Sequence, residues 1–144
     1  MLRDLVQRLA SDIVSLINYI EKHKEHIKHD SLDFPVATRI HEMTASVHER
    51  CEMICRVLCA LRLDGERTIK RAIGRISAFV FFDVDEFVYA KYPALVPEGL
   101  KTGGGYVSMN KSDEIDINAL NRLLAEELRR LQYAISMLYG ACNA

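Results

Sequence analysis

The chain lacks several features that mark other classes of protein. Lysine and arginine total 19 and aspartate and glutamate total 20, so the basic excess that nucleic acid and anionic membranes attract is missing. No apolar run reaches the roughly 18 residues of a membrane span, and Met1 to Asp4 does not begin a secretory signal. Only three prolines and seven glycines interrupt the sequence, which argues against disorder. We therefore expect one soluble domain over residues 1–144, with no nucleic-acid partner and no membrane span.

Signals for disulfides and for zinc are also missing. Cys51, Cys55 and Cys59 recur every four residues, which places them on one stripe of a helix, and Cys142 stands apart. This spacing is not the C-x-x-C of zinc and thioredoxin-type sites. Buried thiols pack as small hydrophobic groups, so we interpret the stripe as core packing. A chain with free thiols is typical of a reducing compartment, and we expect a cytoplasmic location.

Apolar residues recur at helical spacing in four segments, and no segment shows the alternation of a strand. The segments run from about Leu2 to His29, Asp33 to Asp64, Glu66 to Lys91, and Asp113–Asp116 to Gly140. The apolar stripe of the first segment comprises Leu2, Leu5, Val6, Leu9, Ile13, Leu16, Ile17 and Ile20. The sequence therefore predicts an all-α fold, built as a helical bundle.

Capping residues support the boundaries of these helices. Asp33, with Pro35 two residues later, fits the N-cap and first turn of the second helix. Asp113 or Asp116 fits the N-cap of the last helix, and Gly140 fits the position just after its end.

The third segment differs from the others because Ile76 to Phe82 is apolar around almost the whole helix. In a soluble protein this pattern indicates a helix without a solvent-facing side. We therefore expect a hydrophobic central helix wrapped by three amphipathic helices. Residues 93–112 follow it and are expected to form a long loop.

Gly74 and Arg75 stand out within this segment. Glycine inside a helix costs about 1 kcal/mol relative to alanine, and it usually marks a helix start or the close approach of another backbone. A guanidinium beside desolvated surface favours a carboxylate partner. Two interpretations stay open: a helix start whose arginine reaches out to water, or a partner helix that lies over Gly74 and places a carboxylate on Arg75.

The sequence from Gly74 to Phe82, GRISAFVFF, resembles the first homology region of the B-cell-lymphoma-two (Bcl-two) family of apoptosis regulators. That region reads Gly-Arg-Ile-x-Ala-Phe-x-x-Phe, and every fixed position matches. Leu138-Tyr139-Gly140 is similar to the close of the family's last core helix, and Arg3 to Val6 is similar to the fourth homology region. The motifs occur in the family's order, and the resemblance implies the family's all-α fold.

The resemblance also implies a function, that of a pro-survival apoptosis inhibitor without a cofactor. Such a protein sequesters the BH-three helices of pro-apoptotic partners in a hydrophobic surface groove. Gly74 would admit the ligand backbone, and Arg75 would pair with the ligand's aspartate. The other groove residues would be Met43, Val47, Ser77, Ala78, Phe82 and Tyr139. The partners would bring the protein to mitochondria, and the sequence leaves open whether the chain forms a homodimer.

The chain departs from the family in several places. The family's Asn-Trp before Gly-Arg is Ala72-Ile73 here, and the Trp-containing second homology motif is not recognisable. The sequence ends at Ala144 without the family's usual hydrophobic anchor, and it leaves open whether such an anchor was removed or never existed. Short length and eroded motifs are what a viral member would show, by analogy alone, and such a member would act in the host cytoplasm.

A metal site is the first alternative to this hypothesis. His41 and His48 lie seven apart on the second helix, and His23, His26 and His29 lie in a stretch, 21–30, that is charged all round; the chain contains no Glu-x-x-His. Because di-iron bundles need inward-facing Glu and Glu-x-x-His pairs, we interpret this stretch as a solvated helix end. We expect no metal ligands.

An enzyme is the second alternative. We expect Asp83, Asp85 and Glu86 to mark where the third helix returns to water, and no Ser-His-Asp or Cys-His arrangement is suggested by spacing. We therefore predict no catalytic residues. The competing function from a different class is a bacterial helical-bundle interaction module, such as a toxin–antitoxin or nucleotidyltransferase-partner protein, or a metal-binding bundle.

Overall fold

A computed structural model describes residues 1–62, 65–101, 110 and 112–143, and for residues 139–143 it describes the backbone only. Across these ranges the chain is helical, and the one β-type contact is an isolated bridge between Lys28 and Glu114. The prediction of an all-α fold is confirmed.

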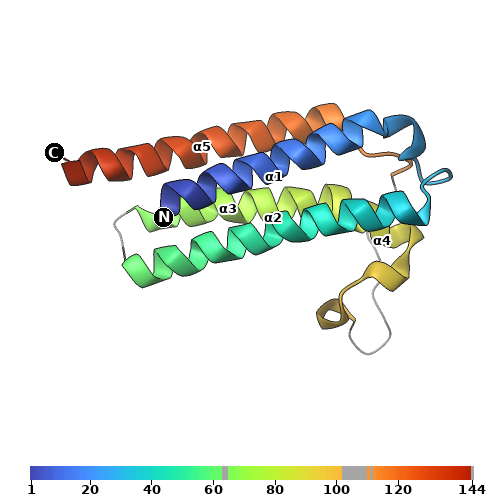
Figure 1. The fold of residues 1–144 in the computed structure, drawn as a ribbon, viewed down its shortest axis with the longest axis horizontal. Coiled ribbons are helices and arrows are strands. Elements are labelled where there is room, and N and C mark those ends of the chain that lie inside the picture. The colour runs from blue at the N-terminus through green and yellow to red at the C-terminus, as the bar shows by residue number, and fades with distance from the viewer. Residues whose placement is uncertain (63–64, 102–109, 111, 144) are drawn as a thin grey trace.

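Long helices run up and down along a common axis (Figure 1). They are α1 (Leu2–Lys22), α2 (Phe34–Leu61), α3 (Glu66–Val80) and α5 (Ile117–Asn143). A π-helical segment, η2 (Phe81–Asp85), joins α3 to the short α4 (Glu86–Lys91) without a break in helical backbone. Three single 3₁₀ turns complete the described elements: η1 (Lys24–His26), η3 (Pro93–Leu95) and η4 (Glu98–Leu100).

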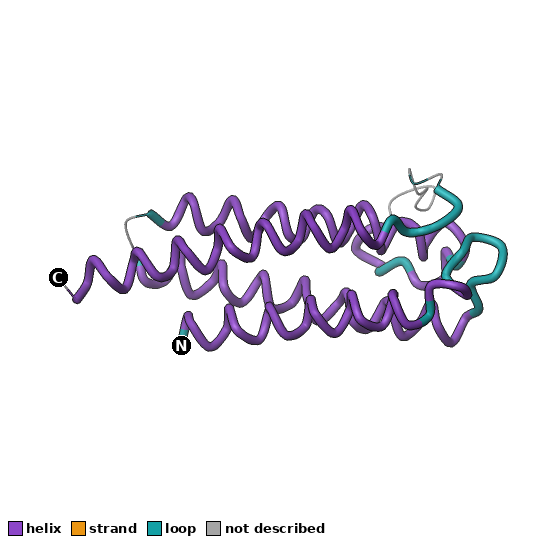
Figure 2. The backbone as a smooth tube through the Cα atoms, turned by 90° about the horizontal axis from the view of Figure 1, so that it is seen from above, coloured by secondary structure: helices purple, strands orange, loops and turns teal. Residues whose placement is uncertain are grey.

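The long helices form a ring in the order α1, α2, α3, α5. The α1 helix packs on α2 and α5, and α3 packs on the same two helices from the opposite corner. Figure 2 shows that these helices lie side by side over most of their length. The arrangement is a four-helix bundle in which each helix has an outer side.

The expectation of a wrapped central helix was wrong. The buried stripe of α3 is narrow and consists of Ile69, Ala72, Ile73, Ile76 and Val80, whereas Phe82 is 56% exposed. The apolar run from Ile76 to Phe82 suggested burial on all sides. Over its whole length, however, the helix carries three arginines, Arg67, Arg71 and Arg75, that mark a solvent-facing side. The α3 helix is therefore amphipathic like its neighbours.

Local signals in the sequence account for much of the rest. All eight predicted stripe residues of α1 are buried. Asp33 is the N-cap of α2, where its Oδ1 accepts a hydrogen bond from the Val36 N–H at 2.9 Å. Asp116 caps α5 in the same way, through the N–H of Ala119 at 3.1 Å. These caps occupy the positions that the sequence predicted.

Two predicted helix ends were misplaced. The first helix ends at Lys22 rather than near His29, because the chain turns into η1 and thereby buries Ile27, which is 2% exposed. The last helix continues through Gly140. The predicted loop at 93–112 contains η3 and η4 in its described part. No helix in the described ranges is both long enough and apolar enough to cross a bilayer.

Candidate functional site

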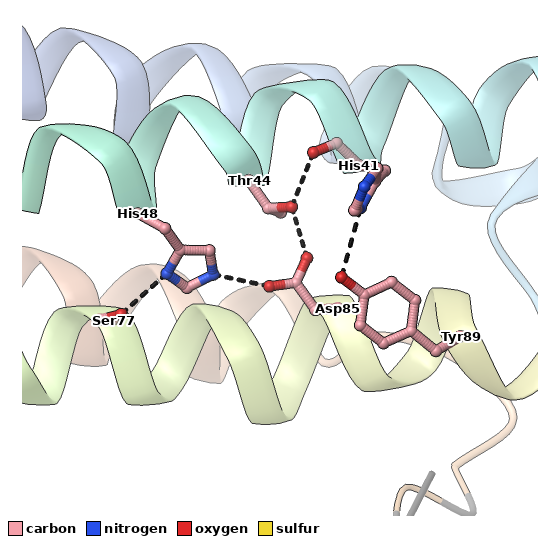
Figure 3. A network of polar contacts seen from close by, with 6 residues as sticks. All are labelled: His41, Thr44, His48, Ser77, Asp85 and Tyr89. Carbon is pink, nitrogen blue, oxygen red and sulfur yellow. Dashed lines mark hydrogen bonds and ion pairs between the residues drawn. The ribbon is translucent and has the colours of Figure 1, made fainter. Parts of the chain in front are cut away.

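A network of polar side chains joins α2 to the helix that faces it (Figure 3). The α2 helix contributes three of its members, at a spacing of three and four residues, and α3, η2 and α4 contribute one each. The members are His41, Thr44, His48, Ser77, Asp85 and Tyr89. Residues that lie 29 to 48 positions apart in sequence therefore meet at one place.

The Asp85 carboxylate is the centre of this network. It is only 2% exposed, and its Oδ2 lies 2.7 Å from His48 Nε2. Its Oδ1 accepts a hydrogen bond from the Thr44 hydroxyl. The second ring nitrogen of His48, Nδ1, lies 2.8 Å from Ser77 Oγ. Because a carboxylate can only accept, His48 donates from Nε2, and in the neutral ring Nδ1 accepts from Ser77.

The π-helical segment η2 places Asp85 and Tyr89 toward α2. The Tyr89 hydroxyl lies 3.4 Å from His41 Nδ1, and the two rings meet edge to face at 5.6 Å between centroids. Single π turns are frequently found at functional sites. The segment is therefore a reason to ask what the network can do.

A shallow hollow of about 330 Å³ opens beside the network. It is lined by His41, Thr44, Ala45, His48, Glu49, Glu52, Asp85, Tyr89 and Pro97. His48 is 29% exposed by its side chain, so an edge of the network reaches this surface.

Ser77, His48 and Asp85 share the hydrogen-bond order of a hydrolase triad, but two requirements of acyl transfer are missing. Ser77 does not line the hollow, so a substrate there would not meet its hydroxyl. Amide N–H groups inside a helix are already bonded to the helix's own carbonyls, which leaves no donors for an oxyanion at that serine. The network therefore acts as a clasp between α2 and η2, with both His48 nitrogens and both Asp85 oxygens engaged.

The structure corrects the expectation for the acidic residues at the end of the third segment. Asp85 and Glu86 are 2% and 4% exposed and do not mark a return to water. Asp85 is buried because Thr44 and His48 supply its hydrogen bonds from α2. The sequence carried a signal for this site, since Thr44 and His48 lie four apart on α2, but it did not show which carboxylate they would meet.

Asp83 differs from its neighbour. Partial burial, reinforced by the charge of Asp116, raises the pKa of the Asp83 carboxyl above its usual value. This carboxyl has no cationic partner among the described residues.

The eight residues predicted to line a groove do not share one surface. Val47 is fully buried, and Met43 lines a hollow with Asp12 and Ser15 of α1. Ser77 is engaged by His48. The side chain of Tyr139 lies outside the described residues. The resemblance implied a groove between the second helix, the start of the third and the last, but Met43, Val47 and Ser77 do not line one surface together, because they face different parts of the bundle.

The remaining four predicted residues, Gly74, Arg75 and Ala78 of α3 and Phe82 of η2, lie at helical spacing on one side of this continuous helical segment. With two further arginines they form what we call the α3 outer face: Arg67, Arg71, Gly74, Arg75, Ala78 and Phe82. A Cβ at Gly74 would meet nothing within 4 Å. Arg75 has a 54% exposed side chain, and Phe82 is an exposed aromatic residue. This face therefore has exposed backbone at Gly74, the positive charge of three arginines, and one exposed apolar side chain, Phe82.

Glu127 of α5 borders the α3 outer face. Its side chain is 5% exposed, and its Oε1 lies 3.7 Å from Arg75 Nη1 and 2.7 Å from Arg130 Nη1. The other carboxylate oxygen, Oε2, is buried without a hydrogen-bond partner. Arg75 is thus drawn toward α5 but is not held there by a hydrogen bond.

The other predicted features have the following outcomes. Within the described ranges no three or more His, Cys, Asp or Glu side chains are grouped to hold a metal ion.

Cys51 packs in the core, and burial raises the pKa of its thiol to about 12. Cys59 is exposed, so core packing was wrong for it. The reason is that a four-residue step advances about 40° beyond a full helical turn.

Comparison with known proteins identifies no relative. No protein-family model, no curated protein and no solved structure matches the chain.

Proposed function

We propose that the chain is a protein-interaction module that binds a helix of a partner protein across the α3 outer face. One observation carries the proposal: Gly74, in the middle of α3, has open space where its side chain would be, directly beside the half-exposed Arg75. Among the described residues no neighbour requires a glycine there, and a backbone from outside can approach most closely at such a position. The Arg75 guanidinium next to Gly74 can bind a carboxylate side chain of the partner helix.

Charge favours an acidic, amphipathic partner helix. The α3 helix contains four basic residues, Arg67, Lys70, Arg71 and Arg75, against one acidic residue, Glu66. Lys70 pairs with Glu66 at 3.1 Å, which leaves the three arginines as the basic groups of the outer face. Phe82 would contact the apolar side of the helix.

The sequence resemblance suggests which partner this is. BH-three helices of pro-apoptotic proteins are amphipathic and carry an aspartate, and the match GRISAFVFF covers the middle and the end of the α3 outer face. We therefore propose a pro-survival role in which the chain sequesters such helices and so blocks cell death. Gly74, Arg75, Ala78 and Phe82 remain in the proposed contact, whereas Met43, Val47 and Ser77 do not, because they face other parts of the bundle.

Titration calorimetry with a BH-three peptide tests the proposal. Arg75→Ala should weaken binding by about 1.5–3 kcal/mol, the scale of a hydrogen bond to a charged group. Gly74→Glu should abolish binding while the helical circular dichroism persists, because its side chain would fill the approach to the backbone. Arg8→Ala is a matched control, since Arg8 is 59% exposed and lies on α1.

Three results would contradict the proposal: no heat of binding to the unmodified protein, equal affinity of the Arg75→Ala variant, or retained affinity of the Gly74→Glu variant. Loss of binding by the Arg8→Ala control would indicate a different surface.

A further inference from the structure

Glu127 and Arg75 form an ion pair at the border of the α3 outer face, in which the carboxylate is buried and the guanidinium is exposed. The Glu127 carboxylate is almost fully buried, and its single hydrogen bond comes from Arg130. Oε2 has no partner. A buried carboxylate with so few hydrogen bonds is costly unless positive charge lies close to it. Arg75, at 3.7 Å, supplies part of that charge from the neighbouring helix.

Arg75 is not fully used by this contact. The distance of 3.7 Å is too long for a hydrogen bond, and a guanidinium has five N–H donors. More than half of the side chain is exposed. It can therefore bind a second carboxylate that arrives from outside, and that carboxylate would compete with Glu127 for the same positive charge.

From this geometry, and resting on the function proposed above, we infer that Glu127 is an internal competitor for Arg75. In the free protein it draws the guanidinium toward α5. A partner helix binds only if its own carboxylate outweighs that attraction. Glu127 is then a specificity-determining residue, since helices without an acidic side chain next to Gly74 cannot displace it.

The inference predicts a gain of affinity, which a purely structural role would not produce. Glu127→Gln removes the competing charge and keeps the shape of the side chain. The variant should bind a BH-three peptide about threefold to tenfold more tightly, the range for one partly screened charge interaction. Glu126→Gln is the matched control, because Glu126 pairs with the same Arg130 at 2.5 Å but is 44% exposed and has no contact with Arg75.

Fluorescence anisotropy with two labelled peptides tests this on the full chain. One peptide carries the BH-three aspartate and the other carries asparagine in its place. The gain from Glu127→Gln should appear only with the aspartate peptide, should vanish in the double variant Arg75→Ala with Glu127→Gln, and should be absent in Glu126→Gln. Circular dichroism verifies that each variant is folded.

The outcomes separate this inference from the function on which it rests. If the unmodified protein binds the aspartate peptide and Glu127→Gln binds it equally or more weakly, the competitor role is overturned and the function stands. If neither the unmodified protein nor Glu127→Gln binds either peptide, the function itself is contradicted. Binding by Glu127→Gln alone would contradict the proposed function of the unmodified protein, although it would support a competition between Glu127 and the peptide for Arg75.

Discussion

Gly74 lies inside α3 with helical backbone on both sides and no neighbour at its Cβ position. The fold would therefore accept alanine there. Alanine loses less conformational entropy than glycine when a helix forms, so glycine at this position is a cost to stability. At the scale of a residue, this glycine therefore does not contribute to the stability of the chain, but it suits the close approach of a partner backbone.

Gly74→Ala should raise the free energy of unfolding by about 0.5–1 kcal/mol, the helix-propensity difference between the two residues. Urea unfolding followed by circular dichroism measures this change. Gly99, which also has open space at its Cβ position but lies in the 3₁₀ turn η4, is the comparison site. A loss of stability in Gly74→Ala would show that the position is more crowded than the structure indicates.

Asp83 makes stability depend on pH. Its pKa is raised in the folded protein by partial burial and by the charge of Asp116, so the folded chain binds this proton more tightly than the unfolded chain. Stability from this group is therefore present at acidic pH and is lost as the pH rises through the raised pKa. At neutral pH the ionised carboxylate is a net cost.

Asp83→Asn should accordingly be more stable than the unmodified protein at pH 7, and its advantage should shrink as the pH falls toward 4. Urea unfolding of both proteins at the two pH values gives this difference. An advantage that stayed constant with pH, or a variant less stable at pH 7, would contradict the assigned cause.

At the scale of the elements, the clasp between α2 and η2 fixes how these helices meet. Its central carboxylate, Asp85, accepts from Thr44 and His48 of α2. Removing one partner of a buried group leaves that group without its hydrogen bond, which costs more than the bond itself contributes.

His48→Ala should therefore lower the free energy of unfolding by about 1–3 kcal/mol, the cost of leaving a buried polar group unpaired. His41→Ala provides the comparison, because His41 makes only the long 3.4 Å contact to the Tyr89 hydroxyl and leaves Asp85 untouched. Thermal or urea unfolding of the two variants checks the order. Equal losses for both would mean that Asp85 does not depend on His48.

The sequence predicted those elements that depend on contacts between residues close together in the chain, and it did not predict those that depend on distant contacts. The stripe of α1 and the caps Asp33 and Asp116 depend on neighbours within a few residues, and these predictions are confirmed. The clasp depends on pairs up to 48 residues apart, which spacing cannot reveal. The prediction of a helix without a solvent-facing side was wrong because it used only the seven residues from Ile76 to Phe82. The arginines that mark the solvent-facing side of α3 precede this run in the sequence.

At the scale of the whole molecule, the ring of four helices decides which predicted site residues can act together. The α1 and α3 helices occupy opposite corners of the ring, each packed on α2 and α5. Met43 lies near α1, whereas Gly74 and Arg75 face outward from α3. In the bundle the motif GRISAFVFF is therefore divided: Ile76 and Val80 are buried in the core, whereas Gly74, Arg75 and Phe82 are exposed.

Amide chemical-shift mapping by nuclear magnetic resonance, with a BH-three peptide added to the labelled protein, tests the central claim most directly. We predict that the largest shifts fall on the six residues of the α3 outer face and on the adjoining side of α5, around Glu127. The amides of α1, at the opposite corner of the ring, should not shift. Shifts concentrated on α1, or no shifts at any peptide concentration, would contradict the account.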